Sequence, residues 1–425
     1  MLRYIYRNST ALVRFLLILQ LHLSRPQRRH ITNVMDALLV CEDSKTLSAL
    51  HRQLVKPPSD VYAVCDCFRA SPWSGADVRT SSQKELVDWA FQLTGPPKNG
   101  TVVYLKIDDS LTEKDRETEH LEAVDWHCDY RLSTKKKKVY KKGLVHVHLS
   151  LQVGTIEVTV NWRLYLRERT VRRLNRQRPK DQRLKFRSKY RLAREMLLDI
   201  VPLIPDGYTT YVLFDSWYAS AKLIRLCKMR LGCEVICAVK SNRHLDGITL
   251  CEHNRTLRHH PYERITLPGA TGQQTTYLVR SLTGRMNNMP FTVRVFVSKR
   301  YYGDGSPCYF LSTDTDLSAQ KVFGHYQRRW SVEVDNLYLK TRLGLGDFRV
   351  QSVEAIAKWY ALVFLTYAYL QRRLEEERSE RIRTIADVIR LHQQEHLVIV
   401  FRTACFLARR TKDIHTAIDR FFQSR

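Results

Sequence analysis

The chain has 425 residues, of which 70 are Lys or Arg and 43 are Asp or Glu, so its formal net charge is +27. With 44% hydrophobic and 10% aromatic residues, it can bury a sizeable core, which excludes a disordered or collagen-like chain. This length suits two or three domains. The excess of positive charge favours a polyanionic partner, because each Lys or Arg placed against a phosphate releases a condensed counterion. Nucleic acid is the first candidate.

The cysteine content and the longest apolar runs indicate in which cellular compartment the protein would fold. Ten cysteines are too few for a disulfide scaffold, and the closest pair, Cys65 and Cys67, has poor spacing for zinc, so we expect reduced thiols in a cytoplasmic protein. The run 12–23 resembles a signal-peptide core but contains Arg14 and precedes no small-residue cleavage site, so we expect an internal helix. The run 359–371 is shorter than the ~20 residues that cross a bilayer, and we expect no membrane contact.

The N-terminal part of the chain is predicted to be helical. Apolar residues recur at three- to four-residue spacing through 31–54 and 83–93. The pairs Pro96-Pro97 and Asn99-Gly100 then interrupt the pattern and mark a boundary. We therefore expect a helical region over 1–98.

Alternating strands and helices follow this boundary. The segment 101–109 is rich in β-branched and apolar residues, and 143–153 and 155–165 alternate like a hairpin joined by one Gly. The pattern continues with helices at 189–200 and 219–231 and strands at 209–215 and 234–240. This order predicts an α/β fold, a mixed sheet with helices packed on its faces, whose first part covers 99–241.

The pattern changes twice more towards the C-terminus. Residues 242–313 contain strand-like pieces between Gly-, Asn- and Pro-rich turns, which indicates a β-rich insertion. From 314 to 371 the pattern is helical and completes the α/β domain. Residues 372–425 form a further helical region, a candidate for oligomerisation.

Carboxylates lie at the ends of two predicted strands. Asp108 or Asp109 ends the first strand and Asp215 ends the fourth. Ligands of open α/β sheets bind beyond the carboxyl ends of the strands, so acids at these places face a crevice. Each also has a purely structural explanation, because Asp215-Ser216 can cap the next helix and Asp109-Ser110 can begin a turn.

A third carboxylate lies on the predicted helix 326–340. At ~100° per residue, four side chains fall within an arc of roughly 60° on one face. They are Tyr326, Arg329, Glu333 and Lys340. Trp330 and Leu337 border this stripe, so we expect it at the margin of the packed surface. The alternative is a solvated helix face on which Arg329 and Glu333 form an i, i+4 ion pair.

Three carboxylates in a strongly basic chain are suited to one kind of chemistry. Two Mg²⁺ ions about 3.5–4 Å apart need shared oxygen ligands, and together they activate a water or 3′-hydroxyl and stabilise the leaving oxygen of a phosphodiester. Mn²⁺ is the expected substitute. Such a site cuts or joins DNA strands. Arg329 and Lys340 would hold the flanking phosphates, and Tyr326 would orient one of them.

These residues resemble a known family. The spacing Tyr326-x2-Arg329-x3-Glu333-x6-Lys340 matches the Y-R-E-K signature of bacterial insertion-sequence transposases with a DDE site. The segments VVYLKIDDSLTEK and YVLFDSWYAS resemble the regions around the first and second aspartates of that family, and the resemblance covers roughly residues 100–371. By motif position, the three acids are Asp109, Asp215 and Glu333.

The resemblance carries further implications. It implies a ribonuclease-H-like catalytic domain, a β-rich insertion between the second Asp and the Glu, divalent metal, and cut-and-paste DNA transposition that often passes through a DNA hairpin. Relatives that flip a base during hairpin formation use an aromatic residue, typically Trp, in the insertion. This chain has no Trp between Trp217 and Trp330, which makes Tyr301 and Tyr302 the candidates for base stacking.

Two basic segments and two histidines complete the candidates. Residues 135–142 contain six lysines, and 163–194 contain 14 Lys or Arg. We expect both segments to contact the DNA backbone, although such runs are also common on solvated surfaces. The candidate phosphate-binding residues are Lys135, Lys136, Lys137, Lys138, Arg172 and Arg173. His146 and His148 alternate on one strand face, and without further ligands nearby we assign them to packing or surface.

The sequence is thus interpreted as a DDE transposase, an Mg²⁺-dependent endonuclease that also transfers strands in DNA recombination. Its partners would be double-stranded DNA and a second copy of the chain, as a homodimer on paired transposon ends in a prokaryotic nucleoid. The helices of 1–98 are candidates for binding the transposon end. The alternatives are an inactive or domesticated DNA-binding derivative and a ribonuclease-H-like nuclease without strand transfer.

Overall fold

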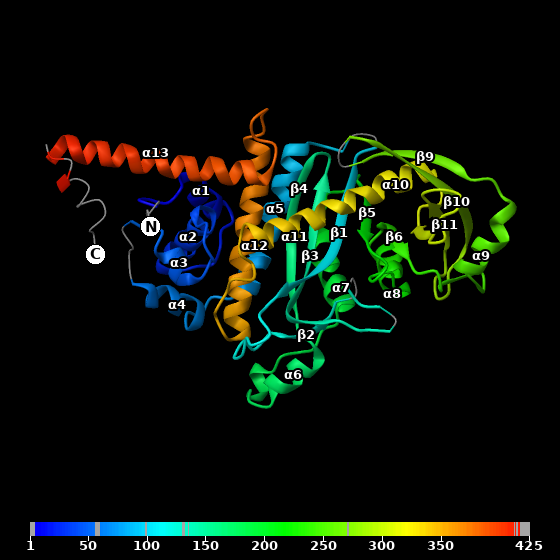
Figure 1. Ribbon diagram of the computed structural model, residues 1–425, viewed down its shortest axis with the longest axis horizontal. Helices are drawn as coiled ribbons and strands as arrows, with labels where there is room; N and C mark the ends of the chain where they lie inside the picture. The colour runs from blue at the N-terminus through cyan, green and yellow to red at the C-terminus, as the bar shows by residue number, and fades with distance from the viewer. Residues whose placement is uncertain are drawn as a thin grey trace.

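The computed structural model describes residues 5–55, 60–97, 100–129, 132–134, 136–269, 272–411, 413 and 415–416. A large sheet runs from the middle of Figure 1 to its strand-rich right-hand end, and a group of helices lies at the left. The predicted mixed α/β fold with helices on both faces of a sheet is confirmed. None of the helices described is both long and apolar enough to cross a membrane.

Ten of the twelve strands that the structure describes form one sheet, in the order β2-β3-β1-β5-β6-β12-β11-β10-β9 with β4 paired to β3. β1 runs parallel to β5, and β5 parallel to β6, whereas the other pairs are antiparallel. The strands are β1 (Val102–Glu113), β2 (Asp125–Cys128), β3 (Tyr140–Val153), β4 (Ile156–Tyr165), β5 (Thr209–Phe214), β6 (Glu234–Val239), β9 (Glu263–Pro268), β10 (Gln274–Arg285), β11 (Thr292–Lys299) and β12 (Cys308–Ser312).

The strands of the expected insertion extend the central sheet. β12 pairs with β6, and β11, β10 and β9 follow outwards. A small hairpin of β7 (His244–Leu245) and β8 (Ile248–Thr249), with helix α9 (Leu250–Thr256), lies between β6 and β9 in sequence. The insertion is therefore hydrogen-bonded to the rest of the sheet.

Helices cover the two faces of the sheet. α11 (Ser331–Thr341) and α12 (Val353–Glu376) pack on one face, where Ser331 contacts Lys106 of β1 and Phe364 stacks on Trp162 of β4. α7 (Lys189–Ile200) packs on the other, where Asp199 binds Arg163 of β4. The remaining helices near the sheet are α6 (Glu168–Asn175), α8 (Ala221–Arg225), which continues as a π-helical turn over Leu226–Arg230, and α10 (Ala319–Gln327).

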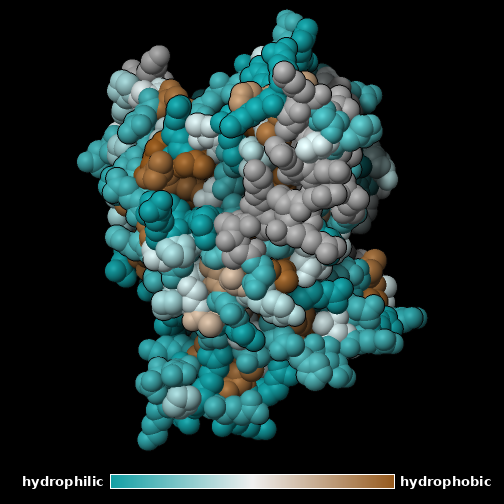
Figure 2. Space-filling view, turned by 90° about the vertical axis from the view of Figure 1, so that its left-hand side faces the viewer, coloured by the Kyte–Doolittle hydropathy of each residue, from teal (hydrophilic) through white to brown (hydrophobic). Residues whose placement is uncertain are grey.

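The N-terminal helices share a core with the C-terminal ones. α1 (Thr10–Ile18) occupies the run that resembles a signal peptide, which is thus an internal helix as expected. Its Phe15 ring lies 5.5 Å from the ring of Tyr369 in α12. α13 (Ile385–Thr411) runs along the same end of the molecule (Figure 1), and Figure 2 faces that end and shows a largely hydrophilic surface with local apolar patches. The other helices there are α2 (Arg25–Val40), α3 (Leu47–His51), α4 (Val61–Arg69) and α5 (Gly75–Thr94).

Candidate active site

The prediction that Asp108 or Asp109 ends the first strand is wrong, because β1 continues to Glu113 with both acids inside it. The two side chains project to opposite faces of the sheet. Side chains alternate along a strand, and residues paired across strands share a face. Asp108 pairs with His148, on the face covered by α11. The Asp109 carboxylate instead accepts a 2.6 Å hydrogen bond from Lys189 at the start of α7 and a 2.8 Å hydrogen bond from the Tyr218 hydroxyl. The strand therefore presents one acid to each side.

Asp215 follows β5, which is the parallel neighbour of β1. Its Oδ1 accepts hydrogen bonds from the backbone N–H groups of Trp217 and Tyr218 at 3.0 and 3.4 Å, which closes a turn. Asp215 does not cap the next helix, because Ser220 is the N-cap of α8. Burial and the charge of Asp109 raise the pKa of the Asp215 carboxyl above its usual value. The two aspartates are thus close enough to repel each other, as the ends of neighbouring parallel strands allow.

Glu333 lies in the first turn of α11 and is linked to the aspartates through Arg329. The guanidinium of Arg329 donates to Glu333 Oε1 at 2.8 Å and lies 3.6 Å from Asp108 Oδ2. Burial raises the pKa of Asp108 to about 7, with Arg329 opposing the shift and the charges of Asp109 and Asp215 adding to it. One arginine thus spans two carboxylates on the α11 side of β1.

The predicted helix 326–340 is not a continuous α-helix. α10 ends at Gln327, and a 3₁₀ turn over Arg328–Trp330 leads into α11. Tyr326 packs 5.0 Å from the ring of Phe310, with the Arg329 guanidinium 5.7 Å from its own ring. Trp330 and Leu337 were expected to border the packed surface, but they are 59% and 57% exposed. The face that carries Arg329, Glu333 and Lys340 therefore borders the core on the side opposite to Trp330 and Leu337, where Val332 and Leu339 are the buried apolar residues of α11.

Lys340 and the strand histidines lie near each other. The charge of Lys340 adds to the effect of burial in lowering the pKa of His148 to about 3 and that of His146 well below its usual value. Both histidines are fully buried, and the His146 ring packs 5.3 Å from Phe364. The prediction that these histidines serve packing is confirmed.

The basic and aromatic candidates lie on the surface. Lys136, Lys137 and Lys138 are exposed, whereas Lys135 lies outside the described residues. Arg172 and Arg173 are exposed on α6, which projects from the bottom of Figure 1, where Arg172 pairs with Glu168 and Arg173 donates to the Glu122 carbonyl. Tyr301 and Tyr302 are 64% and 66% exposed.

Two residues at this site escaped the sequence analysis. Lys189 and Tyr218 both bind Asp109, from 80 and 109 residues away in the chain. Burial and the charge of Asp109 raise the pKa of Tyr218 well above its usual value, so it is a neutral hydrogen-bond donor. In the sequence, the only feature that pointed to Tyr218 was its position three residues after Asp215.

The donor set fits a hard divalent cation. All the candidate ligand atoms are carboxylate oxygens, which Mg²⁺ prefers. Burial and neighbouring carboxylates raise the pKa values of Asp108 and Asp215, and two cations at this site, Lys189 and Arg329, already bind carboxylates. Among the described residues, these acids do not bring three ligand atoms within 4.8 Å of one another.

Comparisons with known proteins agree with this chemistry. A family described as DDE superfamily endonuclease matches residues 19–266, and one described as transposase DDE domain matches residues 187–369. No curated protein matches the chain. A piggyBac transposase, solved as a synaptic complex with hairpin DNA, is similar over 75% of this chain and 56% of its own, at 12% identity and a TM-score of 0.43. The chain thus spans little more than half of that protein. Since the first match covers more than half of the present sequence, the chain belongs to the DDE superfamily endonucleases.

Proposed function

We propose that the chain is a DNA transposase in which Asp109, Asp215 and Glu333 hold two divalent ions, Mg²⁺ with Mn²⁺ as a substitute. The observation that carries this proposal is the position of Asp215 between the other two acids. Burial and the charge of Asp109 raise the pKa of Asp215, and Arg329, the ion-pair partner of Glu333, acts on the same carboxyl in the opposite direction. When bound, the ions activate the attacking water or 3′-hydroxyl and stabilise the leaving oxygen. The substrate is a phosphodiester at a transposon end, and the product 3′-hydroxyl is joined to another DNA strand.

The surrounding cations have a second role in this proposal. Arg329 and Lys189 neutralise carboxylates in the present structure. Divalent ions would supply that charge, and both side chains could then donate to the non-bridging oxygens of the scissile phosphate. The Arg329 guanidinium lies over the Tyr326 ring, 5.7 Å from its centre, and Tyr326 would help to orient it. Lys340, further along α11, would bind a flanking phosphate.

The remaining contacts with DNA are assigned to exposed basic and aromatic residues. Lys136–Lys138 lie between β2 and β3, and α6 follows β4, and a duplex entering the site would pass these two connections. Tyr301 and Tyr302 are free of the core and can stack on an unpaired base. The helices of 1–98 would bind the transposon end, and a homodimer would pair two ends.

The test uses a linear DNA that carries the inverted repeats flanking the reading frame, together with a supercoiled target plasmid. We expect Mg²⁺-dependent cleavage at the repeat ends and joined products in the plasmid. Cleavage without joined products would indicate a nuclease, and a mobility shift without cleavage would indicate a DNA-binding derivative. Either result would overturn the proposal.

A further inference from the structure

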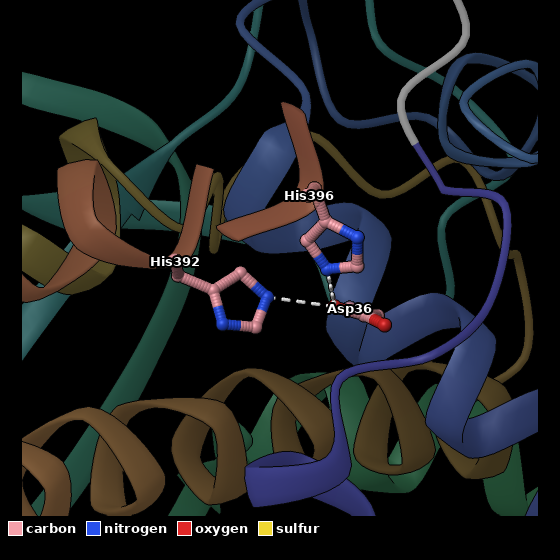
Figure 3. A group of neighbouring side chains, drawn as sticks. All are labelled: Asp36, His392 and His396. Carbon is pink, nitrogen blue, oxygen red and sulfur yellow. Dashed lines mark hydrogen bonds and ion pairs between the residues drawn. The ribbon is translucent and has the colours of Figure 1, made fainter. Parts of the chain in front are cut away.

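Three buried side chains meet between α2 and α13, far along the chain from the acids of the candidate active site. Asp36 comes from α2, and His392 and His396 lie one turn apart on α13 (Figure 3). Nε2 of His392 and Nε2 of His396 lie 2.7 and 2.8 Å from the same oxygen, Oδ1 of Asp36. The exposed fractions of the three residues are 0%, 0% and 1%. Nothing in the proposed transposition chemistry uses this cluster.

The cluster has the composition and spacing of a metal site. Two histidines at i and i+4 place their imidazoles on one face of a helix, and the facing helix supplies the carboxylate. In the part of the chain that the structure describes, this is the one group in which three ligand atoms of His, Cys, Asp or Glu all lie within 4.8 Å of one another. Two imidazoles and one carboxylate suit zinc and related transition metals, whereas Mg²⁺ and Ca²⁺ take oxygen ligands.

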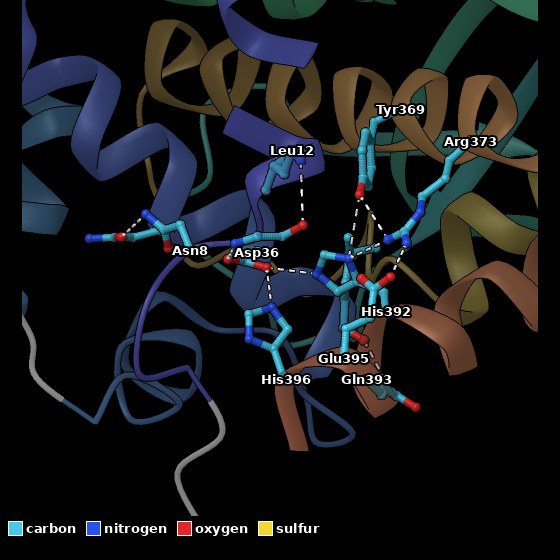
Figure 4. Close-up of polar contacts among 12 residues, drawn as sticks. Asn8, Leu12, Asp36, Tyr369, Arg373, His392, Gln393, Glu395 and His396 are labelled. Atoms are coloured by element: carbon cyan, nitrogen blue, oxygen red, sulfur yellow. Dashed lines mark hydrogen bonds and ion pairs between the residues drawn. The ribbon is translucent and has the colours of Figure 1, made fainter. Parts of the chain in front are cut away.

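The Asp36 carboxylate is fully buried, and its Oδ1 lies within hydrogen-bond distance of both imidazoles. The carboxylate is also oriented, because its Oδ2 accepts the backbone N–H of Ser9 at 2.9 Å. The nearby guanidinium of Arg373 is bound to Glu395 (Figure 4). A buried, oriented anion is the environment in which a cation gains most from binding.

A histidine that binds a metal ion through Nε2 carries its ring proton on Nδ1, so the surroundings of Nδ1 determine how well the imidazole is oriented as a ligand. Nδ1 of His392 lies 3.5 Å from the Tyr369 hydroxyl, which can accept a hydrogen bond from a protonated Nδ1. It also lies 3.3 Å from Arg373, whose guanidinium can only donate hydrogen bonds. Nδ1 of His396 is buried and has no hydrogen-bond partner among the described atoms. The side chain that orients His392 is therefore Tyr369.

We propose that Asp36, His392 and His396 bind one transition-metal ion, with zinc as the closest fit, and that this ion fastens α13 to α2. Zinc bonds of about 2.0–2.2 Å in a tetrahedral site separate ligand atoms by about 3.3 Å, so each imidazole must withdraw from Asp36 by about half an ångström. Small rotations of the two rings achieve this. Three protein ligands leave one position of the ion for a water molecule.

The first measurement is the metal content of the full chain without an affinity tag, purified after growth with zinc and dialysed against Mg²⁺. We expect about one zinc per chain by elemental analysis, because Mg²⁺ does not compete for imidazole ligands. Chelation should lower the thermal midpoint, and added zinc should restore it. Cobalt in place of zinc should give the intense visible absorption of a four-coordinate site. A chain without zinc that gains no stability from added zinc or cobalt would overturn the proposal and leave a hydrogen-bonded Asp-His-His cluster.

Matched variants distinguish loss of a metal ligand from loss of a contact between α2 and α13, and from loss of a residue of the candidate active site. His396→Gln and Asp36→Asn should lose the zinc. Gln393→Ala should keep it, although it removes another interaction of the same helix pair, the 3.1 Å hydrogen bond from Gln393 to the Leu39 carbonyl. Glu333→Gln should also keep the zinc, whatever its cleavage activity. Full zinc content in His396→Gln would overturn the assignment, and the cobalt spectrum of the wild-type chain decides the question if the variants do not fold.

Discussion

At the scale of single residues, neighbouring acids in β1 have separate environments. Asp108 faces Arg329, while Asp109 is held by Lys189 and Tyr218. A shift of one position along the strand moves a carboxylate from one face of the sheet to the other. The chain therefore supplies its own matched pair for identifying the metal ligand.

The first prediction concerns the acids. Asp109→Asn, Asp215→Asn and Glu333→Gln should each abolish Mg²⁺-dependent cleavage and leave DNA binding nearly intact, because in the proposed mechanism the acids hold metal and the basic residues hold phosphate. Single-turnover cleavage and a mobility-shift titration measure the two effects. Asp108→Asn is the control and should still cleave. The opposite outcome for Asp108 and Asp109 would place the first ligand one residue earlier.

The second prediction separates positioning from general attraction to DNA. Arg329→Ala and Lys340→Ala should slow cleavage or joining by roughly 10²-fold or more and weaken binding only several-fold, because a phosphate contact beside the scissile bond acts mainly in the transition state. Arg328→Ala, at an exposed neighbouring position, should change the rate little. Equal losses of rate and affinity would mean that Arg329 and Lys340 merely hold DNA.

At the scale of elements, a buried lysine fastens α11 to the sheet. Lys106 of β1 is fully buried, and its Nζ donates to Gln152 of β3 at 2.9 Å, Glu157 of β4 at 2.5 Å and Ser331 of α11 at 2.7 Å. Lys106 and Asp108 project from the same face of β1. The hydrogen bonds of Lys106 therefore set the position of Glu333 relative to the aspartates.

The third prediction tests this connection. Lys106→Met should cost about 3–5 kcal/mol in the free energy of unfolding, because it leaves Glu157 partly buried without its cation. Adding Glu157→Leu should recover much of the loss, since a buried pair replaced as a unit is often tolerated. Urea unfolding gives the free energies. A single variant as stable as the wild-type chain would show that Lys106 does not hold α11.

The fourth prediction contrasts two basic elements. Lys136–Lys138 are exposed, whereas Arg163 of the second basic segment is bound to Glu195 and Asp199 against α7. The logarithm of the DNA-binding constant falls with log[salt]. Replacing the three lysines with Gln should make this slope less steep by up to about 0.9 for each phosphate that the variant no longer neutralises. Arg163→Gln should leave the slope unchanged and reduce stability instead. An unchanged slope in the lysine variant would remove that segment from the DNA interface.

Elements with a strong local pattern could be predicted from the sequence. The helix at 189–200 has the predicted bounds, and the strand predicted at 209–215 is observed as β5 at 209–214, because periodicity and flanking turns determine them locally. The short strands β7 and β8 were missed, since two residues carry no periodicity. Lys189 and the Asp36 cluster could not be predicted, because tertiary packing brings together residues that lie 80 to 360 positions apart.

At the scale of the whole molecule, the first and last helices depend on each other. Lys358 of α12 donates to the Phe68 carbonyl at the end of α4, and Gln393 of α13 to the Leu39 carbonyl of α2. The apolar faces of α1, α2 and α5 belong to the same core as Trp359 and Leu362 of α12. Neither group of helices buries its apolar residues without the other.

The order of synthesis gives this arrangement a consequence. A ribosome adds roughly 5–20 residues per second, so α1 to α5 leave it well before α12 exists. Until then, their apolar faces have no partner, and the nascent chain is exposed to proteases and aggregation. A chain released before Val353 should accordingly be cleaved rapidly within α1 to α5 in limited proteolysis, and resistance would show that these helices fold alone. Interrupted translation would then leave no stable N-terminal fragment in the cell.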